Sequence, residues 1–462
     1  MKAGKLSTRV ILVFLWLFAF LLSACHPESA IGDATATPTP QPPAPTWVNP
    51  EGTVIVPTPL PTLPPSNLSQ PNPVQVSEMQ FFQDGTRLTI IAKFVNHMPR
   101  TTLRDIQYEL ISLDSAGNRL SSAVGEIRYI FPSETTGIVW EGNVRPLEVV
   151  ESIEVRIHSA KADEKQKKGQ PLKVSTPALF IGTPQAIMTG WLSNTDAATY
   201  TNVQLSAIAY DASGVILGGG SSQMEFVKGK DKVGVSIPAS HLTGTVTRVE
   251  IYPSLGPASA VLEDGNWWKA VRVEQWNLVR DVHNQLAGGA ELTNLTDQLL
   301  VNSFYIITAY DDQNQVNWVE KGPIDLIWPN ESTLFSPGIL QAPTDSMPTH
   351  ADFLIVPGEF GDFPLQYNPL STSQLGVSDA EFPATGSANV ISNLNSNLSE
   401  AFVTMLIYNT EGQIIGGGRQ SCGPIPANGS LKVNIPLAGI GNLDGASLKT
   451  SVTLKRDVII DE

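Results

Sequence analysis

The stretch AYDASGVILGGG, residues 209–220, is the most informative in the chain because altered copies of it recur. Residues 407–418 read IYNTEGQIIGGG, with the tyrosine, the turn, the aliphatic pair and the three glycines in the same order. Shorter versions are AYDDQN at 309–314 and SLDSAG at 112–117. A short element that returns at a fixed period is the sequence signature of tandem structural units.

An asparagine precedes each copy and gives the period. The four asparagines are separated by 98, 100 and 99 residues, and they are Asn96, Asn194, Asn294 and Asn393. We therefore predict four tandem domains, with boundaries at residues 74–160, 172–256, 267–358 and 372–462.

Apolar and polar residues alternate around each copy. Residues 88–94 place four apolar side chains on one strand face and Thr89 and Lys93 on the other, and residues 153–158 and 448–455 alternate in the same way. This period of two indicates antiparallel sheets that are packed on one side. No helical periodicity is sustained after residue 74. The predicted fold is all-β, with four tandem immunoglobulin-like β-sandwich domains that follow a signal peptide and a Pro/Thr-rich linker.

The repeated turn has a direct physical explanation. An Asp at its first position accepts hydrogen bonds from backbone N–H groups further along, and a Gly three residues later adopts a positive φ without steric cost. The pair predicts a hairpin with a type I turn and a G1 bulge. Asn314 replaces the glycine in the third copy, and Asn409 replaces the aspartate in the fourth. For the two glycine triplets we expect close strand packing or a bulge rather than a phosphate-binding loop, since no helix follows them.

These elements together resemble the FxLYD-type domains, which are small immunoglobulin-like modules of bacterial and archaeal envelope proteins. The similarity covers the strand ending in Asn, the Tyr-Asp step as in 208–211, the turn glycine, and a later step such as Pro329-Asn330-Glu331. It is best in the second and fourth copies. The first copy has Leu113 in place of the tyrosine, and the second has Gly229-Lys230-Asp231 at the later step. The resemblance implies a fold and an envelope setting and brings no catalytic site.

The first 24 residues resemble the signal peptide of a bacterial lipoprotein. Basic residues precede an apolar run of 13 residues, Val10–Leu22, which is too short to span a membrane as a helix. The run ends in Leu22-Ser23-Ala24-Cys25, an aliphatic residue and two small residues before a cysteine, as in a lipobox. Acylation of Cys25 would provide a stable anchor if two or more chains are attached. An ordinary signal peptide whose cleavage site contains a cysteine is the alternative.

Residues 25–73 are predicted to be a Pro/Thr-rich spacer. Residues 33–73 contain 13 of the 35 prolines. Proline fixes φ and removes a hydrogen-bond donor, so this composition favours an extended tether of about 3.1 Å per residue over a sheet or helix.

Composition limits the function classes. The formal charge is −15, and no Lys/Arg cluster occurs, so we predict no nucleic-acid partner and membrane contact only through the N-terminal lipid. The six histidines show no ligand spacing, and we predict no metal and no cofactor. Because no catalytic motif is present, we predict that the chain is not an enzyme.

One aromatic concentration occurs, at Trp267, Trp268 and Trp276. Trp267 and Trp268 follow a connector rich in Gly, Pro, Ala and Ser, so we expect them to brace the second and third domains against each other. The alternative is a platform on which sugar rings stack, since planar aromatic side chains offer apolar faces. Trp276 belongs to the same candidate binding set.

The resulting functional prediction is a membrane-anchored extracytoplasmic lipoprotein that acts as a non-catalytic structural or binding scaffold. The alternative is a glycan- or solute-binding accessory lipoprotein of an envelope or transport complex. The expected partner is an envelope protein or a glycan of unknown identity. The expected location is the outer side of a bacterial membrane.

Overall fold

The computed structural model describes residues 73–163, 169–181, 185–262, 266–341, 348–361, 365 and 367–455. For residues 266, 267 and 325 the structure describes the backbone alone. The predicted signal peptide, Cys25 and the spacer lie outside the described residues. Within the described residues the protein is all-β, with one 3-10 turn, η1 (Asn266–Lys269), and no α-helix. Among these residues there is no helix of the length and apolarity that crossing a bilayer requires.

The first strand group contains two three-stranded antiparallel sheets, of order β1-β2-β5 and β4-β3-β6. Its strands are β1 (Val74–Asp84), β2 (Arg87–Asn96), β3 (Thr102–Leu113), β4 (Arg119–Ile130), β5 (Thr135–Asn143) and β6 (Ser152–Asp163). The second strand group pairs a sheet of order β11-β8-β7 with one of order β12-β10-β9-β13. Its strands are β7 (Leu172–Phe180), β8 (Ile187–Asn194), β9 (Thr199–Tyr210), β10 (Ile216–Val227), β11 (Lys232–Pro238), β12 (His241–Leu242) and β13 (Arg248–Leu262).

The third strand group repeats this plan, with β19 added beside β15 and β21 beside β16. Its strands are β14 (Val271–Arg280), β15 (Gln285–Asn294), β16 (Leu299–Tyr310), β17 (Val316–Ile327), β18 (Ser332–Phe335), β19 (Leu340–Gln341), β20 (His350–Val356) and β21 (Glu359–Gly361). In the fourth group the two layers join into one sheet of order β22-β23-β26-β25-β24-β27. Its strands are β22 (Leu370–Val377), β23 (Ala384–Ser392), β24 (Ala401–Tyr408), β25 (Ile414–Cys422), β26 (Ser430–Gly439) and β27 (Ser447–Leu454).

The repeated hairpin turns have the predicted geometry. Each first residue accepts, through Oδ1, the backbone N–H groups two and four residues later, and these residues are Asp114, Asp211, Asp311 and Asn409. The position three residues later has a positive φ, 80° at Gly117, 87° at Gly214, 60° at Asn314 and 79° at Gly412. The type I turn with a G1 bulge is therefore confirmed in all four groups.

The period-setting asparagines close the strands that precede these turns. Asn96, Asn194 and Asn294 are buried, and each side-chain amide donates to backbone carbonyls on the far side of its group. In the fourth group this place belongs to the buried Ser392, whereas Asn393 is exposed. The alignment of Asn393 with the other three asparagines was therefore wrong by one residue.

The glycine triplets allow strands to approach closely, as predicted. A Cβ on Gly218 would overlap the carbonyl oxygen of His241, and one on Gly220 would overlap that of Pro238. In the fourth group, Gly418 lies against the carbonyl of Pro436 in the same way. A side chain at these places would separate the strands, so the triplets are packing elements.

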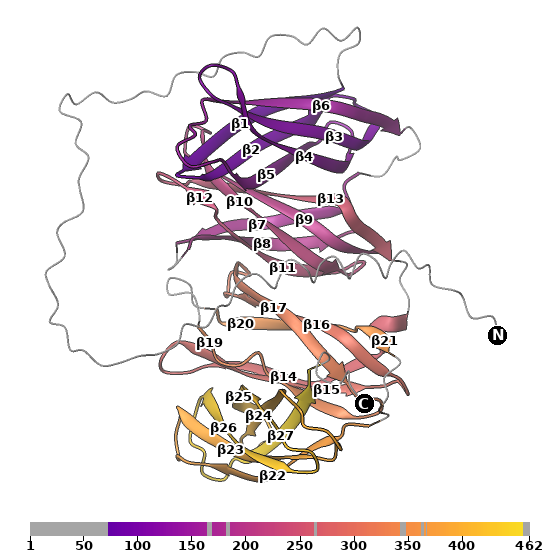
Figure 1. The fold of residues 1–462 in the computed structure, drawn as a ribbon, viewed down its shortest axis with the longest axis vertical. Coiled ribbons are helices and arrows are strands. Elements are labelled where there is room, and N and C mark those ends of the chain that lie inside the picture. Colours follow the sequence, from indigo (N-terminus) through magenta and orange to yellow (C-terminus); the bar gives the residue numbers. More distant parts are fainter. Residues whose placement is uncertain are drawn as a thin grey trace, which may run out of the picture. The chain divides into compact units, whose positions relative to one another are not determined.

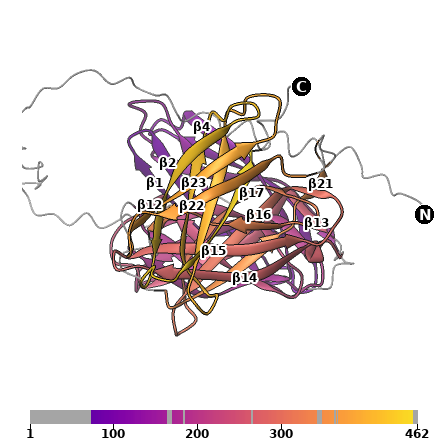
Figure 2. The ribbon, with the colours of Figure 1, turned by 90° about the horizontal axis from the view of Figure 1, so that it is seen from below.

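Hydrophobic clusters fill each strand group and also lie between neighbouring groups. The cluster of the second group takes in Ile306 of the third, and the cluster of the fourth takes in Leu299 and Trp328 of the third. The groups follow one another in chain order, sheet against sheet (Figure 1). Figure 2 shows the strands of the fourth group running across β14 and β15. Residues 73–462 accordingly form one compact unit.

This stacking corrects the expectation that each sheet is packed on one side only. Ile91 and Lys93 lie on the face of β2 opposite to Ile90, yet they are 0 % and 8 % exposed. The sheet of the next group covers that face, so residues on both faces of β2 are buried. The limits of the groups also differ from those predicted, since β13 continues to Leu262 and β22 begins at Leu370.

Candidate functional site

The most structured polar cluster among the described residues lies where groups 1 and 2 meet, which we call the first junction. Its centre is Lys93, whose Nζ lies 3.0 Å from Glu78 Oε1 in its own sheet and 3.4 Å from Glu250 Oε2 of group 2. Burial by itself lowers the pKa of the Lys93 ammonium, but the hydrogen bond to Glu78 and the charge of Glu250 hold it above its usual value. A buried amine is tolerated only when it is paired in this way.

Glu250 collects donors from its own group as well. Its carboxylate accepts the hydroxyl of Tyr210 at 2.9 Å and also contacts the Tyr252 hydroxyl and Arg248. Burial alone would raise the pKa of this carboxyl, but the tyrosine hydrogen bonds and the nearby charge of Lys93 hold it below its usual value. The carboxylate is therefore a fixed anchor for the Lys93 ammonium across the junction.

Apolar side chains surround this polar centre. They form a separate buried cluster contributed by both groups, namely Ile91, Val139, Ile208, Tyr210 and Ile216. Gly137 makes the close approach possible, because a Cβ there would lie 2.6 Å from Tyr252 Cδ2 and 2.9 Å from Ile208 Cδ1. The first junction thus combines a tightly packed apolar cluster with a network of paired charges around Lys93.

The second junction, between groups 2 and 3, has an indole where the first has an amine. Trp191 is 3 % exposed and meets the ring of Tyr310 edge-on, with centroids 5.4 Å apart. Its Nε1 donates to the carbonyl of Asn314 at 2.8 Å. An ion pair adds to the junction, because Lys321 Nζ lies 2.8 Å from a carboxylate oxygen of Glu225.

The third junction, between groups 3 and 4, has the reverse charge arrangement of the first. Glu291 of β15 pairs with Lys449 of β27, N to O 2.5 Å. The Lys449 ammonium also lies 4.7 Å from the centre of the Tyr408 ring. The apolar part consists of Leu334, Leu406, Tyr408 and Ile414.

The tyrosine of the Tyr-Asp step therefore has a role that sequence reasoning did not assign. Each of these tyrosines packs against the preceding strand group: Tyr210 against group 1, Tyr310 against group 2 and Tyr408 against group 3. Leu113 occupies the same place in group 1, before which the structure describes no strand group. The recurrence of tyrosine in three copies, and its replacement in the first, was the available signal.

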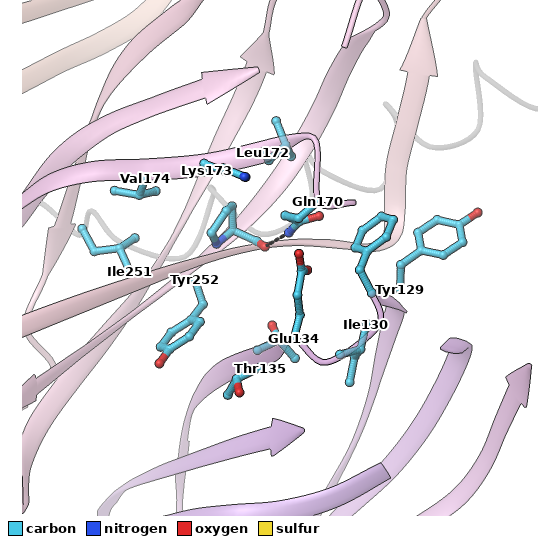
Figure 3. Close-up of a pocket in the computed structure, with 13 residues that line it drawn as sticks. Tyr129, Ile130, Glu134, Thr135, Gln170, Leu172, Lys173, Val174, Ile251 and Tyr252 are labelled. Carbon is cyan, nitrogen blue, oxygen red and sulfur yellow. Dashed lines mark hydrogen bonds between the residues drawn. The ribbon is translucent and has the colours of Figure 1, made fainter. Parts of the chain in front are cut away.

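A cavity of about 280 Å³ lies beside the first junction (Figure 3). The β4–β5 connection forms one wall, and residues 170–174 with 251–253 form the other. Gln170 Nε2 donates to the carbonyl of Pro253 at 3.0 Å across its floor. Tyr129 and Tyr252 stand on opposite sides of it (Figure 3).

Glu134 is the acidic group of this cavity, and its carboxylate points toward Gln170 (Figure 3). Burial raises the pKa of its carboxyl, while the backbone N–H of Gln170 and the charge of Lys173 act against this shift. A half-buried acid beside an amide, two tyrosines and threonine hydroxyls can form hydrogen bonds with a small polar molecule. A second cavity of about 370 Å³ at the same junction is lined mainly by polar residues, including Gln204 and Gln223.

The predicted tryptophan set is not gathered at one place. The ring of Trp268 lies 5.5 Å from the Lys228 ammonium of group 2, and the ring of Trp276 stacks on Phe353 within group 3, centroids 5.6 Å apart. The side chain of Trp267 and all of Cys25 lie outside the described residues. The connector predicted before Trp267 is largely strand, since Ala260–Leu262 pairs with β9. The facing sheets therefore also contribute to the relative orientation of groups 2 and 3.

The described residues contain no group of three His, Cys, Asp or Glu side chains arranged to hold a metal ion. Cys422 is buried, and this burial raises the pKa of its thiol to about 11. An ordinary thiol this poorly ionised is a weak nucleophile at neutral pH.

No protein-family model matches the chain, and no curated protein matches it. Among solved structures, Escherichia coli alpha-2-macroglobulin activated by porcine elastase is 9 % identical, with a TM-score of 0.13, over 82 % of this chain and 44 % of that one. Salmonella alpha-2-macroglobulin reacted with methylamine is 10 % identical, with a TM-score of 0.12, over 82 % of this chain and 28 % of that one. Latent PorU from Porphyromonas gingivalis is 8 % identical, with a TM-score of 0.12, over 83 % and 34 %. The chain spans less than half of each of these proteins, and similarity at this level carries no argument about its fold or function.

Proposed function

We propose that this chain is a lipid-anchored extracytoplasmic protein whose four tandem immunoglobulin-like β-sandwich domains form a non-catalytic scaffold. Each strand group corresponds to one domain in this proposal. The observation that carries it is that all three junctions bury side chains from both neighbouring groups. Domains joined only by linkers swing freely, whereas an extensive apolar contact fixes their relative orientation. A fixed array of this kind holds bound partners at defined distances from one another.

The anchor in this proposal is Cys25, at the end of the lipobox-like stretch Leu22-Ser23-Ala24. Lipid supplies the membrane affinity that an acidic chain without a basic cluster lacks. Cells expressing the chain with a fatty-acid probe should label the wild-type protein and leave Cys25→Ala unlabelled. Cys422→Ala is the matched control and should label normally. Label on Cys25→Ala would refute the anchor.

Rigidity of the scaffold is measured separately. With Cys25 and Cys422 replaced by Ser, spin labels at Ala116→Cys in group 1 and Glu411→Cys in group 4 occupy exposed turn positions. We expect a single narrow distance distribution between them. A broad distribution would show independent domains and refute the scaffold.

The cavity at the first junction favours a second function, which is binding of a glycan unit. Tyr129 and Tyr252 provide aromatic surface, and Glu134 and Gln170 provide an acceptor and a donor for hydroxyl groups. Glu134→Ala should then reduce retention of the purified chain on envelope polysaccharide. Glu151→Ala, which changes charge equally at an exposed position outside both cavities, is the control. Equal retention of both variants would exclude glycan binding at this place.

A further inference from the structure

The three junctions place different residues at one equivalent position of the preceding group. Lys93, Trp191 and Glu291 each lie three residues before the buried Asn that ends the strand. In sheet register they face Gly137, Gly234 and Leu334, the corresponding positions of the neighbouring strands β5, β11 and β18. This position therefore holds a cation at the first junction, an indole at the second and an anion at the third.

The following group also presents one equivalent position to each junction. Glu250, Asp352 and Lys449 face, in register, the residue two before the junction tyrosine, namely Ile208, Thr308 and Leu406. Glu250 and Lys449 form the ion pairs with Lys93 and Glu291, and Asp352 accepts the Tyr310 hydroxyl at 3.3 Å. At the first and third junctions the charge at the second position is thus opposite to the charge at the first.

Two incorrect pairings would place like charges at these positions. If group 1 packed on group 4, Lys93 would face Lys449. If group 3 packed on group 2, Glu291 would face Glu250. Each incorrect pairing brings like charges together in a contact that is partly shielded from water, where the mutual repulsion is stronger than at a free surface.

We propose that the residues at these two positions disfavour packing of group 1 on group 4 and of group 3 on group 2, and so contribute to the order of the stack. The proposal goes beyond the scaffold function, because it concerns how four similar sandwiches in one chain avoid packing on the wrong neighbour. Charge complementarity contributes to partner choice more than to affinity, and an incorrect partner is rejected by the repulsion it meets.

A double-mutant cycle at the third junction tests the proposal in the mature chain. The variants are Glu291→Lys, Lys449→Glu and the two combined, and the readout is hydrogen exchange of the amides in β15 and β24. Each single reversal should speed exchange about tenfold, and the combined reversal should return it to within about threefold of wild type. Lys432→Glu, at an exposed position of β26, changes net charge as Lys449→Glu does and should have no effect.

Transfer of one junction's charges to another tests choice of neighbour directly. Glu78→Gln, Lys93→Glu and Glu250→Lys together give the first junction the charges of the third, since Gln275 faces Glu291 as Glu78 faces Lys93. This triple variant should exchange more slowly in β2 and β9 than Lys93→Glu alone. The effects of the single substitutions on hydrogen exchange can be added to predict the combined variants. The proposal is wrong if the amides of the combined variants exchange as fast as that sum predicts.

Discussion

Lys93 and Glu291 occupy equivalent places in β2 and β15 and carry opposite charges into their junctions, where each meets a partner of the complementary sign. An ion pair on a protein surface contributes little to stability, since water and salt screen it. At these junctions at least one partner is largely shielded, with the side chain of Lys93 11 % exposed and that of Glu291 18 % exposed. The Lys93 pair therefore belongs to the packed interior of the molecule, whereas Lys449, with its side chain 52 % exposed, places the Glu291 pair at the edge of its junction.

Replacement of Tyr210 by Phe should destabilise the first junction. The change removes the hydroxyl that donates to Glu250 and leaves a partly buried carboxylate with one donor fewer. A hydrogen bond to a charged group contributes roughly 1.5–3 kcal/mol, so urea unfolding should show a loss of that size. Tyr408→Phe is the matched control, because its buried hydroxyl has no hydrogen-bond partner among the described residues. Equal losses in the two variants would contradict the assigned role of the Tyr210 hydroxyl.

A methyl group at Gly137 should force the first junction apart. The new Cβ would lie within 3 Å of Tyr252 Cδ2 and Ile208 Cδ1 of the next group. Overpacking of this kind costs about 1–3 kcal/mol, and we expect Gly137→Ala to show it in the free energy of unfolding. Gly169→Ala adds a methyl group where no atom lies within 4 Å, and it should leave stability unchanged. A neutral Gly137→Ala would mean that the groups are not in tight contact.

The strands and turns were accessible from the sequence because their causes are local. Asp211 and Gly214 define their turn by their own hydrogen bonds and φ, whatever surrounds them. Junction residues are different. Lys93 has the alternation of a solvated side chain, and only the sheet of the next group buries it. No local pattern reports that the outer face of a sheet is covered by a neighbour about 100 residues further along.

The fourth period-setting residue shows the same limit. Asn393 fits the spacing of the other asparagines, but the strand ends one residue earlier, at Ser392. Spacing locates a repeat to within a residue, whereas the inward or outward direction of a side chain changes with every residue of a strand. Side-chain packing determines that Ser392 is buried and Asn393 is exposed, and a single sequence does not show that packing.

The first junction should weaken in acid. The pKa of the Glu250 carboxyl is lower in the folded protein than its usual 4.5, so its contribution to stability is complete above that value. The contribution is lost as pH falls through the lower folded pKa, because protonation removes the charge that holds Lys93. In denaturant unfolding from pH 7 to pH 3, wild type should lose more stability than Glu250→Gln. Parallel curves for the two proteins would show that this carboxyl does not couple to folding.

The contribution of Glu134 to stability should depend on pH in the opposite direction. Burial raises the pKa of its carboxyl in the folded state, so the charged form is penalised at neutral pH and the penalty disappears as pH falls below 4.5. Glu134→Gln should therefore be more stable than wild type at pH 7, and the two proteins should converge in acid. The same unfolding series measures it, and a variant less stable than wild type at neutral pH would contradict the assigned penalty.

Trp191 should fix the second junction more strongly than Trp267 and Trp268 do. Its indole is buried between the two groups, its Nε1 donates to Asn314, and its ring meets Tyr310. Truncation of a buried tryptophan costs about 3–5 kcal/mol, part of which comes from the cavity that remains. Trp191→Ala should therefore broaden the distance distribution between spin labels in groups 2 and 3. The double substitution Trp267→Ala and Trp268→Ala should broaden it less, because the facing sheets remain in contact and β13 stays paired with β9. If the double variant has the larger effect while Trp191→Ala leaves the distribution narrow, then the connector, and not the sheet faces, fixes the orientation of these two groups.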